Sequence, residues 1–310
     1  MKVFLLAPAA LWATLALWFL SPWAAAAWSA LLALVWRRLP RPRAALATAA
    51  GILLVALLWT RVSPSIRRDW APDVARIPRV LFAGDRVEIR DVRNASYRTP
   101  EDFDVRWETR RFSLDALERV DFVVEPFADW RGPAHTFLTF GFSGGEHLAI
   151  SVETRRERGE SYGPVKGLFR RYELAYVFAD ERDLIGLRAN VRGHPVHLYP
   201  VRATKTQARA LFVSMLRRAD RLAEQPEFYN TLTNTCTTNI TRHLAELTGE
   251  PLPLDLRVIL PGYADGLALE LGLIDAEGSL DALRKRFRIN ARSAFGADGP
   301  GWSRQIRQAP

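Results

Sequence analysis

The first sixty residues are almost continuously apolar, whereas the rest of the chain mixes apolar and polar positions. Three apolar runs cover residues 3–20, 23–36 and 44–60, and Ser21-Pro22 separates the first two. A helix that spans a membrane needs about 20 apolar residues. Residues 1–62 are therefore predicted to form two or three transmembrane helices, the middle run being either a separate span or the continuation of a kinked first one.

Four arginines between the second and third runs predict the orientation of these helices. Arg37, Arg38, Arg41 and Arg43 are expected to stay in the cytoplasm by the positive-inside rule, so the next span leads out of it. Everything after residue 61 then lies outside the cytoplasm, in the periplasm or the exterior. A cleaved signal peptide with small residues at 24–27 is the competing interpretation, but residues 44–60 would still anchor the product.

After a linker at residues 63–78, the pattern predicts one α+β domain at residues 79–293. Period-two alternation and turn residues indicate strands at 86–98, 106–111, 120–127, 135–142, 147–153, 172–179 and 195–201. Helical spacing indicates helices at 205–223, from about residue 236, and at 262–274 and 280–288. We expect an antiparallel sheet with helices packed on one side, and a disordered tail at residues 294–310.

The strands at 135–142 and 147–153 form a predicted hairpin around Ser143-Gly144-Gly145. Every second residue in each strand is a large apolar one, and both apolar sets must face the same core. A slip of one residue reverses every side chain, so the burial pattern requires a three-residue loop. This register places His135 opposite Glu153 on a face of small and polar residues.

Composition narrows the classes of function. The 310 residues are 48% hydrophobic, and the formal charge is +9. The basic residues are nearly all arginines scattered among acidic residues, not gathered in a stripe with aromatics, so nucleic acid is not an expected partner. One cysteine excludes an internal disulfide, and no signal for an oligomeric state is present.

That cysteine, Cys236, lies in the segment EFYNTLTNTCTTNITRH at residues 227–243. Helical spacing begins here, with Asn234 or Thr235 as the expected N-cap. A thiol in the first helical turn is close to the positive end of the helix dipole, which favours the thiolate. Two interpretations remain open, a nucleophile and an inert buried side chain.

A nucleophilic thiol needs a base and a group that orients the base. His243 is two helical turns beyond Cys236, too far for a hydrogen bond. His194 and His197 flank Pro195 and are expected to face solvent, and His147 lies at the loop end of its strand. His135 is the best candidate, because the predicted register supplies Glu153.

Other chemistries lack their motifs. The chain has no HExxH or CxxC motif, no G-x-S-x-G elbow and no phosphate-binding glycine loop, so neither a metal site nor a cofactor is expected. Arg155, Arg156 and Arg158 suit phosphate or lipid headgroups, although a solvated loop is the preferred interpretation.

Five blocks of sequence carry a family resemblance. They are HTFLTFGF (135–142), LAISVETRRERGESY (148–162), YELAYVFADERD (172–183), EFYNTLTNTCTTNI (227–240) and LPGYAD (260–265). Over residues 69–292 the chain resembles the Lnb N-terminal periplasmic domain family, named after a bacterial lipoprotein N-acyltransferase. The resemblance and the order His, Glu, Cys imply a permuted papain-like (NlpC-type) domain with Cys236 as nucleophile, His135 as base and Glu153 as orienter. Asn234, Thr235, Thr237 and Tyr162 are further candidates for binding substrate or an oxyanion, although the residues beside Cys236 have a simpler role in capping the helix.

The resemblance implies a cysteine acyltransferase or hydrolase that works through a thioester, anchored in a bacterial inner membrane with its soluble domain in the periplasm. Its expected partners are a membrane lipid, a lipoprotein or both, and transfer of a lipid acyl group to a lipoprotein amino terminus is one such reaction. Two alternatives stay open. One is a cell-wall amidase or peptidase with the same three residues, and the other is a non-catalytic membrane protein.

Overall fold

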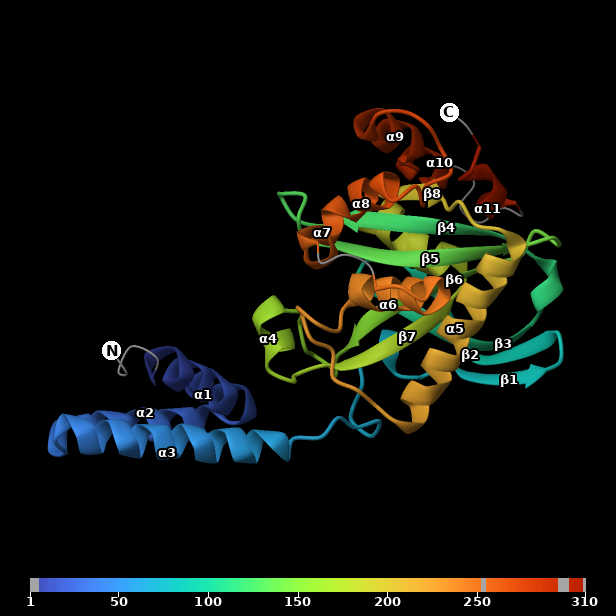
Figure 1. The fold of residues 1–310 in the computed structure, drawn as a ribbon. Helices are drawn as coiled ribbons and strands as arrows, with labels where there is room; N and C mark the ends of the chain where they lie inside the picture. The colour runs from blue at the N-terminus through green and yellow to red at the C-terminus, as the bar shows by residue number, and fades with distance from the viewer. Residues whose placement is uncertain (1–5, 252–254, 295–300, 309–310) are drawn as a thin grey trace.

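The computed structural model describes residues 6–251, 255–294 and 301–308. It begins with three helices that lie side by side and extend away from the rest of the molecule, α1 (Leu6–Leu20), α2 (Pro22–Arg38) and α3 (Arg41–Thr60) (Figure 1). The chain breaks between α1 and α2 at Ser21, because the Ser21 hydroxyl caps the start of α2 and Pro22 occupies its first turn. The predicted start of that run, at residues 3–5, lies outside the described residues.

The number of predicted spans needs a correction. Within the described residues, α3 is the one helix that is long and apolar enough to cross a membrane, with 20 residues and a mean hydropathy of 1.7. Its rise of 1.5 Å per residue gives about 30 Å, the thickness of a bilayer core. With 15 and 17 residues, α1 and α2 are shorter, because Ser21-Pro22 and Leu39-Pro40 break the apolar sequence.

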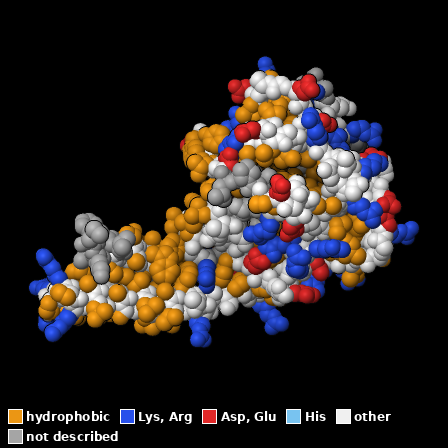
Figure 2. All heavy atoms as spheres, in the orientation of Figure 1, with side chains coloured by type: hydrophobic (Ala, Val, Ile, Leu, Met, Phe, Trp, Pro, Cys, Tyr) orange, Lys and Arg blue, Asp and Glu red, His pale blue; other side chains and the backbone are white. Residues whose placement is uncertain are grey.

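The outer surface of these helices is apolar. Small residues and tryptophans pack between them, including Ala13, Ala16 and Trp28. Large side chains such as Leu46, at 72% exposed, and Trp23, at 85%, point outward. Figure 2 shows this hydrophobic covering along the helices. An exposed apolar surface of this extent marks a membrane or protein contact, and it supports membrane anchoring.

The domain is α+β, as predicted, around one eight-stranded sheet. Its strands are β1 (Arg79–Ala83), β2 (Arg86–Tyr97), β3 (Phe103–Ser113), β4 (Leu117–Pro126), β5 (Ala134–Phe142), β6 (His147–Arg155), β7 (Glu173–Ala179) and β8 (His197–Pro200). The order is β1-β2-β7-β6-β5-β4-β8, and β3 pairs with β2. All these pairings are antiparallel except β2 with β7, so the sheet is mixed.

The register of the β5–β6 hairpin is confirmed. Phe137 pairs with Ser151 and Gly141 with His147, and the amide of Phe142 donates to the carbonyl of Glu146 at 2.9 Å. The loop therefore has three residues, and the same register continued by two residues sets His135 opposite Glu153. The parity argument from burial was sufficient to place these two side chains on one face.

Helices cover one face of the sheet, where the larger core lies. They are α5 (Lys205–Glu224), α6 (Cys236–Thr248), α8 (Ala264–Glu270) and α9 (Leu280–Phe287). Shorter helices are α4 (Pro164–Leu168), α7 (Leu256–Ile259), α10 (Asn290–Ala294) and α11 (Trp302–Gln305), with 3₁₀ turns at Pro72–Val74, Leu114–Ala116 and Pro261–Tyr263. Phe140 of β5 and Phe212 of α5 make one of the aromatic contacts in this core, at 4.9 Å between ring centroids.

The opposite face is also buried, which corrects the expectation of helices on one side. A π-helix at Arg182–Val191 brings Leu184 and Ile185 against Phe137 and Ala149. The side chains of β5 and β6 that point away from the larger core therefore lie under a second layer and not on an open polar face. Since no short-range sequence pattern distinguishes a π-helix from a loop, the pattern did not reveal this layer.

The expectation of a disordered tail is wrong for residues 301–308. Trp302 is 1% exposed and Ile306 is 0% exposed, and both belong to this second core. Arg307 adds a buried ion pair with Asp121 at 2.8 Å and another with Glu181. Local composition suggested disorder, but these three side chains attach the segment to the sheet. The rest of the predicted tail, at 295–300 and 309–310, lies outside the described residues.

Candidate functional site

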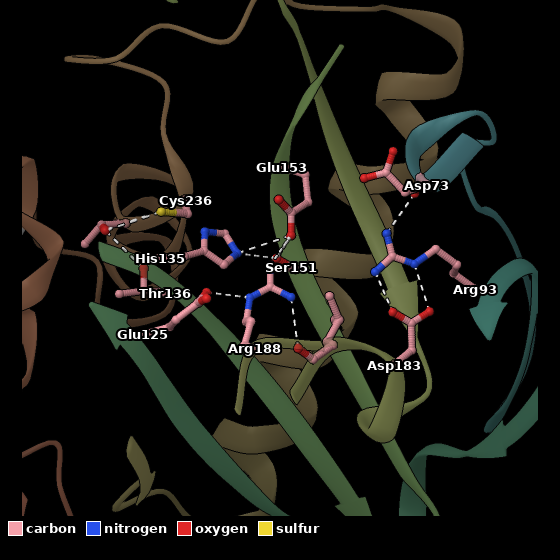
Figure 3. A network of polar contacts seen from close by, with 12 residues as sticks. Asp73, Arg93, Glu125, His135, Thr136, Ser151, Glu153, Asp183, Arg188 and Cys236 are labelled. Atoms are coloured by element: carbon pink, nitrogen blue, oxygen red, sulfur yellow. Dashed lines mark hydrogen bonds and ion pairs between the residues drawn. The ribbon is translucent and has the colours of Figure 1, made fainter. Parts of the chain in front are cut away.

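Cys236 is the first residue of α6, as the helical spacing predicted. Thr235 is the N-cap and exchanges hydrogen bonds with Thr238 in a capping box, which decides between the two predicted caps. Asn234 has a different role, since its amide donates to the carbonyl of Phe228 at 2.9 Å and holds the preceding loop. Cys236 is 6% exposed, and its sulfur lies on the side of Thr136 in β5 (Figure 3).

His135 lies between Cys236 and Glu153 (Figure 3). Its Nε2 is 2.6 Å from the hydroxyl of Ser151 and 3.3 Å from Oε1 of Glu153. The Ser151 hydroxyl in turn donates to Oε1 of Glu153 at 2.7 Å. The other edge of the imidazole faces Cys236, so Glu153 and Ser151 position the ring from the side opposite the cysteine.

The ionised forms of Cys236, His135 and Glu153 stabilise one another. Burial by itself raises the pKa of Cys236, but attraction and hydrogen bonding to His135, with further hydrogen bonds from Thr136, lower it to about 7. Burial lowers the pKa of His135, yet Glu153 and Cys236 outweigh that effect and raise it to about 10. Burial also raises the pKa of Glu153, and His135 and Arg188 hold it well below its usual value. At neutral pH the arrangement favours a thiolate beside an imidazolium.

Arg188 of the π-helix is a site residue that the sequence analysis missed. Its Nη2 donates to Glu153 at 2.9 Å, and its Nε lies 2.6 Å from Oε2 of Glu125 on β4. The guanidinium is almost fully buried and also lies over the ring of Phe137 at 5.2 Å. It joins carboxylates from two strands on either side of β5 and fixes Glu153. Nothing in the sequence around Arg188 indicates this contact.

Two threonine hydroxyls lie on the other side of the thiol. Thr237 Oγ1 is 3.7 Å from Sγ of Cys236 and 3.0 Å from Oγ1 of Thr136. Thr237 was among the sequence candidates, and Thr136 was not. Thr136 directly follows His135 in β5, so the register that places the imidazole also places this hydroxyl.

A cavity of about 260 Å³ adjoins these groups. Cys236, His135 and Glu153 all line it, together with Tyr162, Tyr229 and Arg188. Tyr162 is thereby placed at the cavity, whereas Asn234 does not line it. The cavity wall is about equally polar and apolar, so it suits a substrate with a polar reacting group.

The remaining histidines have other partners. His243 lies 2.7 Å from the Tyr176 hydroxyl and 2.7 Å from the Ser214 hydroxyl, which agrees with its expected distance from Cys236. His147 lies at the loop end of β6, near the carbonyl of Gly145. His194 also lines the cavity, at 2.8 Å from Glu125. His197 is 5% exposed, so its prediction as a solvent-facing residue was wrong.

Two of the three arginines after Glu153 hold the preceding linker in place. Arg155 is 3% exposed and donates to the carbonyls of Val74 and Ala75. Arg156 pairs with Asp73 and Arg158 with Asp69. The contacts of Arg155 and Arg156 attach the linker to β6, which corrects the interpretation of these two as part of a solvated loop. Arg158 lies in an exposed turn, as that interpretation expected. Among the residues that the structure describes, no three His, Cys, Asp or Glu side chains are grouped to hold a metal ion.

Comparison with known families gives one result. Residues 103–262, just over half of the chain, match the model of the Lnb N-terminal periplasmic domain. Neither the curated proteins nor the solved structures contain a match. The matched region includes β5, β6, the π-helix and α6, and therefore Cys236, His135, Glu153 and Arg188.

Proposed function

The chain belongs to the Lnb N-terminal periplasmic domain family, and on that basis we propose that it is a membrane-anchored periplasmic cysteine acyltransferase. The observation that carries the proposal is the thiol of Cys236, with a pKa of about 7, beside His135 on a cavity wall. A lowered pKa and a partner base are the requirements for a nucleophilic cysteine. They also argue against a purely structural thiol, because burial alone would raise its pKa.

In the proposed first step, the Cys236 thiolate attacks the carbonyl carbon of a lipid ester. The imidazolium of His135 gives its proton to the leaving alkoxide, so a thioester and a lysolipid alcohol form. Glu153 and Ser151 hold the imidazole in position, and Arg188 holds Glu153. The first-turn N–H groups of α6 and the hydroxyls of Thr136 and Thr237 are the proposed donors to the oxyanion.

In the second step, an amine attacks the thioester carbon. The now neutral His135 accepts the amine proton, and the thiolate leaves as the amide forms. A lipoprotein amino terminus is the proposed amine, and water in its place gives hydrolysis. His135 thus acts as the general acid in the first step and as the general base in the second.

We further propose a permuted papain-like topology for the domain and an inner-membrane location. The chain order His135, Glu153, Cys236, with the thiol on a helix that packs against the histidine strand, supports the topology. In the proposed orientation α3 spans the bilayer, with α1 and α2 packed along it. The arginines around residue 40 stay in the cytoplasm, and the domain lies in the periplasm.

Acyl labelling tests the proposal. The full chain in phospholipid nanodiscs, supplied with a phospholipid radiolabelled in its acyl chains, should acquire a label that neutral hydroxylamine removes. Cys236→Ala should acquire none, and Cys236→Ser should acquire at most a label that resists neutral hydroxylamine. Absence of acyl label on the wild-type protein, together with release of peptides from muropeptides, would overturn acyl transfer in favour of the amidase alternative.

A further inference from the structure

The periplasmic domain carries a concentration of exposed apolar side chains beside its cavity. We call this set the apolar rim, and it consists of Phe127 and Trp130 in the β4–β5 loop, Tyr162, Val165 and Leu168 at α4, Leu232 before α6, Leu256 and Ile259 on α7, and Tyr263. Leu256 is 73% exposed and Trp130 is 55% exposed. Among the described residues of the domain, the other large apolar side chains of comparable exposure are Leu81, Phe82 and Leu271.

Contacts between the segments show that the rim is one connected region. The hydroxyl of Thr231 donates to the carbonyl of Pro164 at 2.7 Å, which joins the Leu232 loop to α4. Leu232, Leu256 and Ile259 line one groove. The amide of Gly262 donates to the carbonyl of Gly132 at 3.0 Å, which joins the α7 segment to the β4–β5 loop.

Gly262 shows how close this last approach is. A Cβ at this position would lie 1.6 Å from the carbonyl oxygen of Arg131. Only glycine lets the two backbones meet there. The motif LPGYAD therefore holds the β4–β5 loop, and with it Trp130, beside α7.

The helices α1–α3 are attached to the same region. Phe169, directly after α4, stacks on Phe19 at 5.2 Å between ring centroids and makes an edge contact with Trp59 at 6.2 Å. Arg170 donates to the carbonyls of Trp59 and Val62 at the end of α3. These contacts place α4 at the end of the anchor that is nearest the domain.

The direction of the anchor decides what the rim faces. In Figure 1 the helices extend from the domain toward the side on which α4, α7 and the β4–β5 loop lie, and Figure 2 shows apolar side chains along that edge. If α3 crosses a bilayer along its axis, the bilayer surrounds the helices and its surface lies against this edge of the domain.

We infer that the apolar rim docks on the surface of the bilayer, with the lipid headgroup and acyl boundary as its partner. Aromatic and aliphatic side chains at such a boundary bury apolar area while their backbone stays hydrated. Phe127 and Tyr162 belong both to the rim and to the wall of the Cys236 cavity. Docking therefore brings the cavity to the lipid surface, independently of which bond the thiol attacks.

Nitroxide spin labels on the apolar rim measure whether it contacts lipid. Cys236 is the single cysteine, so Cys236→Ser gives a background without other thiols. Single cysteines at Leu256, Trp130 and Val165 receive a nitroxide label in the full chain, reconstituted in phosphatidylcholine–phosphatidylglycerol nanodiscs. Phe82, 42% exposed on β1, is the matched control, because it is an exposed apolar residue outside the rim.

The readout is the ratio of collision rates with oxygen, which concentrates in lipid, and with a water-soluble nickel chelate. We expect a ratio at least severalfold higher at the three rim positions than at Phe82. Ratios at the rim equal to that at Phe82, with normal folding shown by circular dichroism, would overturn the inference. Because the labelled protein lacks the thiol, this outcome is independent of acyl transfer.

Discussion

The imidazole of His135 is closer to the hydroxyl of Ser151 than to the carboxylate of Glu153, at 2.6 Å against 3.3 Å. The hydroxyl donates to Glu153, so the protonated Nε2 of His135 donates to Ser151 and is connected to the carboxylate through it. Ser151 is therefore a positioning residue of the proposed site. It sits two residues before Glu153, on the same face of β6.

Ser151→Ala is expected to slow acylation of Cys236 by roughly fivefold, the equivalent of one hydrogen bond of about 1 kcal/mol. Loss of the Ser151 bridge should also lower the pKa of His135, which stabilises the thiolate less and moves the pH midpoint of thiol alkylation upward. Ser151→Thr, which keeps the hydroxyl, is the matched control. An unchanged rate and midpoint in Ser151→Ala would show that the direct contact with Glu153 is sufficient.

The pH dependence of alkylation tests the ion pair between Cys236 and His135. The pKa of the thiol is lowered to about 7, so the iodoacetamide rate should rise with pH to a midpoint near 7, below the ordinary value of about 8.5. In His135→Gln the largest effect that offsets burial is removed and only the hydrogen bonds from Thr136 remain, so the midpoint should rise well above that of the wild type. A wild-type midpoint at the ordinary value would contradict the thiolate–imidazolium pair.

Removal of Arg188 should destabilise the fold. Glu125 is 1% exposed, and Arg188→Met would leave its carboxylate with weaker partners, at a cost of ~3–5 kcal/mol in the free energy of unfolding. Arg98→Met, in an exposed ion pair with Asp102, should have little effect. Urea unfolding of the full chain in detergent, followed by tryptophan fluorescence, measures both.

The double variant Arg188→Met/Glu125→Gln separates charge from packing. If the cost comes from an unpaired buried carboxylate, the neutral amide that replaces the Glu125 carboxylate should recover a large part of it. No recovery in the double variant would assign the loss to packing of the guanidinium against Phe137 instead.

The buried ion pair between Arg307 and Glu181 should make the stability of the protein sensitive to acid. Burial raises the pKa of Glu181, but Arg307 outweighs burial and lowers the pKa to about 2. A depressed carboxyl pKa contributes stability above its unfolded value of 4.5, and the contribution is lost as the pH falls from 4.5 toward 2. The wild-type protein should therefore lose stability through this window.

Arg307→Met should be less stable than wild type at neutral pH, because Glu181 and Asp121 are each 1% exposed and would lose this cation. The difference between the two proteins should narrow as the pH falls below the unfolded value of 4.5, since protonation removes the unpaired charge. Thermal unfolding at several pH values measures this difference. A difference that does not depend on pH would mean that Arg307 acts through packing alone.

Short-range sequence patterns determined many of the helices and strands of this protein and one strand register. The apolar runs predicted the anchor, and alternation predicted the seven strands from 86–98 onward, close to their observed bounds. The parity of two apolar sets predicted the register of the β5–β6 hairpin, and therefore the pairing of His135 with Glu153. Such patterns suffice wherever one face of an element must be buried, because a slip of one residue would expose it.

Tertiary structure alone decided which groups complete the site. Arg188 reaches Glu125 and Glu153 from a π-helix with no sequence signature. Alternation places Ser151 on the face of Glu153, but only the structure shows that its hydroxyl lies between Glu153 and His135. The packing of Trp302 and Arg307 turned a polar tail into part of the core. Contacts between elements far apart in the chain depend on the arrangement of whole layers, and a local pattern carries no information about its partner. The attachment of the α4 segment to α1 and α3 belongs to this class, and it decides which edge of the domain lies toward the anchor helices.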